Sequence, residues 1–173
     1  MSNGSSEWPL MPSGQPPRVV PPTAPGYSTD DRLTLTAMWS TERREGQWLI
    51  PPYLWVSPSL SNVYLNCLRA VPAAPVIDLF VNGGMGSVIL VVPDGWGVDT
   101  NHLGKGIGSV KNQVGSNPVP GAPLFVVGGS IALGTFKARH ANWLDLKRLQ
   151  WVERRRALGG GPSKITDGGP SLR

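Results

Sequence analysis

The chain contains a single cysteine, Cys67, among its 173 residues. A lone cysteine cannot form an internal disulfide, which excludes a fold stapled by disulfides. Cys67 lies in the run Val63–Leu68, on the face shared with Val63 and Leu65, so we expect a buried thiol in a reducing compartment. One cysteine and two separated histidines also make a zinc site unfavourable, and we expect neither a metal nor a cofactor.

Long apolar runs are missing as well. No stretch of about 20 apolar residues occurs, so we expect no transmembrane helix. The segment Met1–Pro9 has neither the positive region nor the apolar region of a signal peptide. The sequence therefore predicts a cytoplasmic protein whose contact with a membrane, where there is any, is peripheral.

The sequence has no recognisable set of catalytic side chains. His102 is expected in a loop before Gly104, and His140 is expected after the last strand, without a patterned Asp or Ser partner for either. The segment Gly104–Gly108 looks like a phosphate-binding loop, but no helix pattern follows it to supply an anion-binding N-terminus. We therefore expect no enzymatic activity.

Glycine (22 residues) and proline (18 residues) are abundant, and their distribution divides the chain. Residues 1–29 contain seven prolines and are predicted to be a disordered Pro-rich tail. Residues 159–173 are predicted to be a second disordered tail, rich in Gly and Pro. Between the tails we expect a β domain over residues 30–140 and a helix over residues 141–158.

The β domain is expected because apolar residues recur there with a period of two. In the segment Arg32–Trp39, the apolar side chains alternate with polar ones, as in a half-buried strand. Gly and Pro punctuate most of the joints between such segments. Further short strands are predicted at Val76–Val81, Val88–Val92, Leu124–Val127 and Phe136–Arg139.

A repeated motif is the most informative feature of this region. Four segments share the order apolar, small, small-polar, bulky apolar: they begin at Leu60, Met85, Ile107 and Leu133. A degenerate fifth copy is Trp39-Ser40-Thr41. The bulky positions are 41, 63, 88, 110 and 136, which are separated by 22, 25, 22 and 26 residues. Such regular spacing is typical of stacked structural repeats.

The motif predicts a β-solenoid-like stack with about 22–26 residues per repeat, in which equivalent corners lie above one another. Glycines at the corners are expected to have positive φ or to allow close approach of neighbouring coils. The corner residues are Gly86, Ser87, Gly108, Ser109, Gly134 and Thr135. Asn62, Ser87, Ser109 and Thr135 are expected to form one polar column, and Val63, Val88, Val110 and Phe136 one inward apolar column. The alternative is an antiparallel β-sandwich in which Gly-Ser only marks turns.

These corners, together with Ser40–Trp48 and Gly134–Arg139, resemble the LiaF-like C-terminal domain of the actinobacterial cell-wall-active antibiotic response protein family. The resemblance covers roughly residues 31–139. It implies a β-solenoid-like fold, no enzymatic activity, and a regulatory role in sensing envelope stress. Relatives commonly carry a transmembrane anchor or a helical N-terminal domain, and this chain has the Pro-rich segment instead.

The predicted C-terminal helix has Asn142 as a cap, Asp145 in its first turn and three arginines in its last turn. Its apolar stripe, Leu144, Trp151 and Leu158, either caps the open end of the stack or binds a partner protein or a membrane surface. Candidate partner-binding residues are Arg43, Arg44, Trp48, Trp143, Arg148, Trp151, Arg154, Arg155 and Arg156. For Arg43 and Arg44, local pairing with Glu42 and Glu45 is the favoured interpretation.

Three hypotheses for the function follow. The leading one is a regulatory protein-interaction module that binds a signalling or envelope component. The second is a self-associating, bactofilin-like scaffold in which stacks join end to end, in a phage-encoded or cellular setting. The third is nucleic-acid binding through the basic helix, ranked last because the domain lacks a basic face interleaved with aromatic residues.

Overall fold

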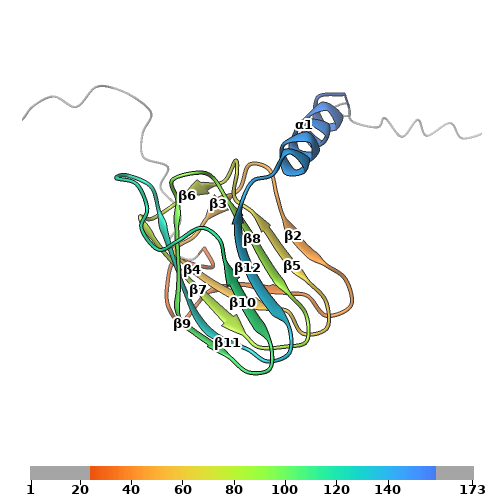
Figure 1. Cartoon of the computed structure of the whole chain (residues 1–173). Helices are drawn as coiled ribbons and strands as arrows, with labels where there is room; N and C mark the ends of the chain where they lie inside the picture. Colours follow the sequence, from red (N-terminus) through yellow and green to blue (C-terminus); the bar gives the residue numbers. More distant parts are fainter. Residues whose placement is uncertain (1–23, 159–173) are drawn as a thin grey trace, which may run out of the picture.

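The computed structural model describes residues 24–158 of the chain, without the side chains of Val152 and Arg156. The tail predictions for residues 1–23 and 159–173 lie outside the described residues. The described part is all-β up to its C-terminal helix, as expected (Figure 1). The elements are β1 (Leu33–Thr36), β2 (Glu42–Arg44), β3 (Leu49–Ile50), β4 (Tyr53–Ser57), β5 (Val63–Asn66), β6 (Val71–Pro72), β7 (Val76–Asn82), β8 (Val88–Val92), β9 (Gly97–Lys105), β10 (Ser109–Asn112), β11 (Leu124–Ile131), β12 (Thr135–His140) and α1 (Trp143–Leu158).

The strands form two five-stranded sheets and one short pair. Sheet A has the order β1-β4-β7-β11-β9, sheet B has the order β2-β5-β8-β12-β10, and β3 pairs with β6. Every strand pair within the described residues is parallel, so the antiparallel sandwich considered above is wrong. We call a strand of sheet A and the sheet B strand that follows it in the chain one level.

The order of the levels differs from the order of the chain. Level β11–β12 lies between β7–β8 and β9–β10, whereas the repeat predicted that successive coils stack in sequence. Composition explains why level β11–β12 lies inside the stack and level β9–β10 at its edge. Strands at the centre of a parallel sheet are more apolar than strands at its edge. The central strand β11 begins with Leu-Phe-Val-Val, while the edge strands β9 and β10 carry His102, Lys105 and Lys111.

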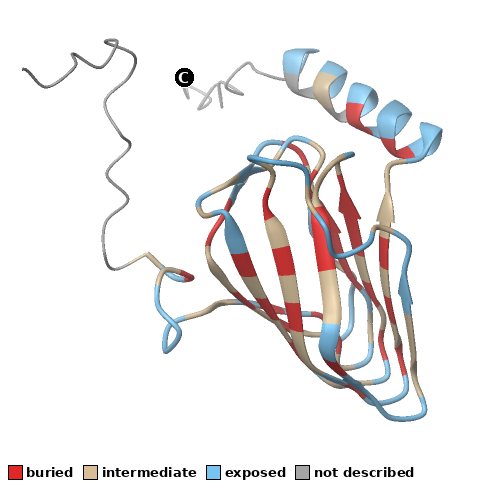
Figure 2. Cartoon of the chain, turned by 60° about the vertical axis from the view of Figure 1, so that its left-hand side comes forward, coloured by how far each residue is buried: buried red, intermediate tan, exposed pale blue. Residues whose placement is uncertain are grey.

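The predicted apolar column is present. Val63 is in register with Val88, Val88 with Phe136, and Phe136 with Val110. The first three are fully buried, whereas Val110 at the edge is partly buried against the core. The fifth copy is shifted by one residue, because Glu42, rather than Thr41, aligns with Val63. Figure 2 shows buried residues alternating with less buried ones along the strands.

The glycine corners are explained by close approach of neighbouring levels. A Cβ on Gly86 would lie 1.8 Å from the Ser61 carbonyl oxygen, and one on Gly134 would lie 1.7 Å from that of Gly86. Gly86, Gly108 and Gly134 are not among the glycines with positive φ, so that alternative is wrong. The polar column also forms: Ser87 N donates to Asn62 Oδ1 at 3.0 Å, and the hydroxyls of Ser109 and Thr135 are 3.0 Å apart.

The folded part begins earlier than predicted. Residues 24–29 were assigned to the tail, but Gly26 is buried and its carbonyl accepts a hydrogen bond of 2.9 Å from Tyr53 N. Cys67 is buried as expected, and burial raises the pKa of its thiol well above the ordinary value. Within residues 24–158, no helix has the length and apolar character needed to cross a membrane.

Candidate functional site

Helix α1 begins at a reciprocal cap. Asp145 N donates to Asn142 Oδ1 at 3.0 Å, and Asn142 N donates to Asp145 Oδ2 at 2.9 Å. Each side chain thus satisfies a backbone N–H that the first turn of a helix leaves without a partner. The carboxylate of Asp145 also complements the positive end of the helix dipole. The predicted role of Asn142 as a cap is confirmed.

Asp145 also holds the helix against sheet B. It is only 6% exposed, and it accepts a hydrogen bond of 2.9 Å from the Tyr64 hydroxyl of β5. The guanidinium of Arg139 from β12 binds both carboxylate oxygens, with 3.1 Å between Nη2 and Oδ1. A buried charge is tolerated when it is paired and fully hydrogen-bonded, as it is here. One carboxylate therefore joins α1 to two strands.

The pKa values in this cluster reflect the same contacts. Burial and the bond to Asp145 raise the pKa of Tyr64 to about 12. Burial alone would raise the pKa of Asp145, but the bonds from Arg139, Asn142 and Tyr64 outweigh it and hold that pKa below its ordinary value. The bond to Asp145 raises the pKa of Arg139. At neutral pH the cluster therefore contains a neutral tyrosine, a carboxylate and a guanidinium.

The remaining contacts of α1 lie toward the first levels of sheet B. Leu149 is 5% exposed, Glu153 pairs with Arg69, and Arg148 Nε lies 3.9 Å from Glu45 Oε2. The helix therefore runs across the carboxyl ends of the sheet B strands, where Figure 1 shows it above the stack. The interpretation that its stripe Leu144, Trp151 and Leu158 caps an open end of the stack is wrong, because these side chains are exposed. The anchors of the helix at Asp145 lie on the inner strands β5 and β12 of sheet B.

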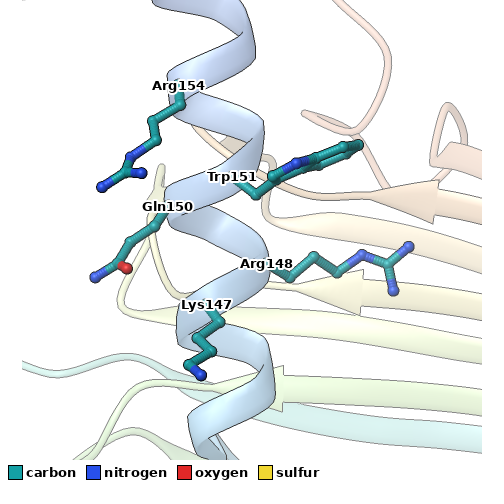
Figure 3. Close-up of a pocket in the computed structure, with 5 residues that line it drawn as sticks. All are labelled: Lys147, Arg148, Gln150, Trp151 and Arg154. Carbon is teal, nitrogen blue, oxygen red and sulfur yellow. The ribbon is translucent and has the colours of Figure 1, made fainter.

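The outer face of α1 carries aromatic and cationic side chains together. Lys147 Nζ lies 4.8 Å from the centroid of the Trp143 ring, and Arg155 Cζ lies 3.9 Å from that of Trp151. Trp143 is 63% exposed and Trp151 is 54% exposed. A shallow hollow of about 530 Å³ is lined by Lys147, Arg148, Gln150, Trp151 and Arg154 (Figure 3). Leu144 and Leu158 of the predicted stripe are also exposed.

The structure brings most of the candidate partner-binding residues onto this one helix. The helix exposes five of them: Trp143, Arg148, Trp151, Arg154 and Arg155. Arg156 belongs to the same helix, but its side chain is not among those that the structure describes. Two other candidates lie on β2, a strand at one edge of sheet B. Arg44 Nε lies 3.4 Å from Glu42 Oε1, as the local-pairing interpretation expected, and Arg43 lies 5.3 Å from the centroid of the Tyr64 ring.

Trp48 belongs to the fold rather than to this surface. It packs against the core, and its Nε1 donates to the Asn66 carbonyl oxygen at 3.1 Å. Sequence reasoning did not identify Tyr64 and Arg139 as the residues that hold the helix. The signal for Asp145 was present, but it was attributed only to the helix dipole.

A second group of aromatic and charged residues lies on the outer face of sheet A. Arg32 binds both oxygens of Asp78 at 3.0 Å and lies over the rings of Tyr53 and Phe80. The Trp55 and Phe80 rings stack with centroids 4.7 Å apart. The charges of Arg32 and Asp78 satisfy each other, so this group stabilises the face and presents no unpaired charge to a ligand.

The two histidines lie in different places from those expected. His102 belongs to β9 rather than to a loop, and His140 is the last residue of β12. His140 Nδ1 is 3.3 Å from Asp94 Oδ1, a neighbour that the sequence did not indicate; the Asp94 side chain is 97% exposed. Within the described part of the chain, no three His, Cys, Asp or Glu side chains form a group that could hold a metal ion.

Comparison of the chain with protein-family models, curated proteins and solved structures finds no match.

Proposed function

We propose that this chain is a non-enzymatic protein-interaction module in which α1 binds an acidic surface of a partner protein. The observation that supports this most directly is the combination on α1 of exposed tryptophans and cations with a buried anchor at Asp145. A surface helix without a binding role does not need two exposed tryptophans. The proposal also takes the stack as β-solenoid-like, which gives the helix a rigid support.

The chemistry of α1 suits a protein partner. Tryptophan and arginine are the residues most enriched among those that dominate binding energy at interfaces. Lys147, Arg154 and Arg155 would complement carboxylates on the partner and accelerate association. Because Asp145 already fixes the helix, little conformational entropy remains to be lost on binding.

The setting of envelope-stress signalling rests on the resemblance of residues 31–139 to the LiaF-like domain. It makes a signalling or envelope component the expected partner, with the chain in the cytoplasm or at the membrane periphery. This part of the proposal stands on sequence alone, and its test is the identity of the partner.

The binding proposal is tested with purified proteins. A partner captured from the host by the wild-type chain is purified, and its affinity is measured by isothermal titration calorimetry against wild type and the variant Trp151→Ala with Arg154→Glu. We expect at least about tenfold weaker binding by the variant, since one central tryptophan often contributes that much. Lys111→Glu, on β10 away from α1, is the matched control and should bind like wild type.

Two results would contradict the proposal. One is a captured partner whose affinity is the same for the α1 variant and for wild type. The other is capture of nucleic acid alone, with affinity that falls steeply as salt concentration rises, which is the signature of phosphate contacts.

A second candidate, end-to-end assembly, is favoured by the open edges of the stack. Among the described strands, β1 and β2 at one end, and β9 and β10 at the other, each have a single neighbour in their sheet. The register of β9 shifts opposite Val126 and Gly128, however, and such irregular edges hinder pairing with another chain. Sedimentation velocity over a wide concentration range distinguishes end-to-end assembly from a monomeric interaction module. A chain that stays monomeric at every concentration excludes assembly.

A further inference from the structure

The connections from sheet A to sheet B each carry a large, exposed apolar side chain at the same position of the repeated motif, and the first connection carries a second one, Met38, which is 53% exposed. We call this set the corner ridge. It comprises, in the order of the levels, Trp39 (85% exposed), Leu60 (54%), Met85 (62%), Leu133 (52%) and Ile107 (88%). In the sequence these are the first residues of the repeated motif, and nothing in the fold requires them to be apolar, because their side chains face solvent.

The ridge is continuous along the stack. Each member stands three residues before a position that is in register across sheet B, from Glu42 through Val63, Val88 and Phe136 to Val110. Hydrogen bonds also join the corners themselves: Leu133 N donates to Gly84 O and Ile107 N to Ala132 O, both at 3.0 Å. Four steps of about 4.8 Å give a ridge about 19 Å long.

The segments that form the corners contain no charged residue. They are Met38–Thr41, Ser59–Asn62, Gly84–Ser87, Gly106–Ser109 and Ala132–Thr135. The residue after each ridge side chain is Ser or Gly, so no neighbouring side chain shields the ridge from solvent on that side. Figure 2 shows these connections as mostly exposed, at the end of the sheets opposite α1. A row of exposed apolar side chains on the surface of a folded domain indicates a contact surface.

The charges beside the ridge are mainly positive. Four residues after the ridge positions, the outward column of sheet B contains Arg43, Lys137 and Lys111, together with Tyr64 and Ile89. Lys105 precedes Ile107 by two residues and is exposed. Glu42 is the one carboxylate in the strands of sheet B, and it is paired with Arg44. The ridge thus combines exposed apolar side chains with a basic border.

We infer that the corner ridge binds the surface of an anionic lipid bilayer. Its apolar side chains would enter the interface between headgroups and acyl chains, where tryptophan is favoured, while the lysines and arginine contact lipid phosphates. A ridge is convex, and a fluid bilayer receives a convex edge without a matching groove. A second copy of this chain fits less well, because it would bring a second column of cations against the first.

The inference goes beyond the proposed function and does not depend on it. The ridge lies before the amino ends of the sheet B strands, and α1 lies across their carboxyl ends. The two surfaces are therefore accessible at the same time. A chain bound to a membrane through the ridge would present α1 to a protein partner.

Sedimentation with vesicles tests the inference on the full chain. The vesicles consist of phosphatidylcholine alone or of about three parts phosphatidylcholine to one part phosphatidylglycerol. We expect binding to the anionic vesicles that weakens with salt and is at least about tenfold weaker for the variant Trp39→Gln, Met85→Gln, Ile107→Gln. The matched control replaces three exposed apolar residues elsewhere: Val71→Gln, Val76→Gln, Val119→Gln, which are 60%, 50% and 54% exposed.

Four outcomes overturn the inference. They are a wild-type chain that does not bind anionic vesicles, equal binding by wild type and the ridge variant, equal loss in the ridge and control variants, and a concentration-dependent dimer that only the ridge variant abolishes. Circular dichroism establishes that both variants fold. Loss of vesicle binding with Trp151→Ala and Arg154→Glu, but not with the ridge variant, would instead assign the membrane contact to α1.

Discussion

The hydroxyl of Tyr64 donates a hydrogen bond of 2.9 Å to Asp145, a residue 81 positions later in the chain. Tyr64 belongs to β5 and Asp145 to the first turn of α1, and Arg139 of β12 completes the cluster. The position of α1 on the molecule is therefore set mainly by one buried carboxylate, with Leu149 and the Glu153–Arg69 pair further along the helix. Any role of the helix in binding depends on the same contact.

We predict that Asp145→Asn loosens α1. The substitution removes the charge that pairs with Arg139 and leaves a largely buried guanidinium without its counter-charge, at a cost of about 2–4 kcal/mol in the free energy of unfolding. Tyr64→Phe removes one hydrogen bond and should cost about 1 kcal/mol. Urea denaturation gives both values, and hydrogen exchange should rise throughout residues 143–158. Unchanged exchange in the Asp145→Asn variant would contradict the role of this anchor.

We predict that stability falls at acidic pH through Asp145. Its folded-state pKa lies below the ordinary value, so the unfolded state binds more protons, and its contribution is present above the unfolded pKa of about 3.9. The contribution is lost as the pH falls from there through the folded pKa. Urea denaturation across this range should show a shallower decline for Asp145→Asn than for wild type. An identical decline would assign the acid sensitivity to other carboxylates.

At alkaline pH, we predict that stability falls through Tyr64 as the pH rises. The pKa of Tyr64 is raised to about 12, so its contribution is complete below the unfolded value of about 10 and is lost as the pH rises toward 12. Burial also raises the pKa of Cys67, which adds to the loss in wild type. Comparing Tyr64→Phe with wild type isolates the tyrosine: the variant should lose less stability between about pH 10 and 12. Parallel curves would show that Tyr64 ionises as freely in the folded state as in the unfolded one.

The corner glycines should tolerate no side chain. For Gly134→Ala we expect a loss of about 2–4 kcal/mol, because the new Cβ would meet the Gly86 carbonyl oxygen at 1.7 Å and the levels would have to separate. Gly128→Ala is the matched control, since the nearest atom to its Cβ is the His102 oxygen at 3.9 Å. The control should change stability by no more than about 1 kcal/mol in thermal or urea unfolding. Equal effects of the two substitutions would exclude close packing as the reason for glycine at position 134.

Local and periodic features of the fold could be predicted from the sequence. The spacing of Val63, Val88 and Phe136 identified residues that lie in register, and Gly86 and Gly134 were correctly placed where levels approach closely. The cap at Asn142 was recognised because its partner is three residues away. Each of these features is determined by a short segment or by a repeated one.

Features that depend on distant pairing could not be predicted. The insertion of β12 between β8 and β10 is a choice among strand neighbours, and the repeated motif is the same for each of them. Strand β9 was missed because its polar residues, which suit an edge, lack the alternation expected of a half-buried strand. The exposure of Trp151 and Leu158 followed from the anchor at Asp145, whose partners lie on other strands.

The order of the levels is the central claim, since it sets which members of the corner ridge are neighbours and leaves β5 and β12, the strands that hold Asp145, separated by β8 alone. Oxidation of cysteine pairs tests it directly. Ile89 is in register with Lys137 on the neighbouring strand, and Lys137 is in register with Lys111 one strand further away. Ile89→Cys with Lys137→Cys should therefore form a disulfide, whereas Ile89→Cys with Lys111→Cys should not, because two strand spacings of about 4.8 Å exceed the reach of about 7 Å. A disulfide between positions 89 and 111, and none between positions 89 and 137, would show that the levels stack in chain order and would contradict the account.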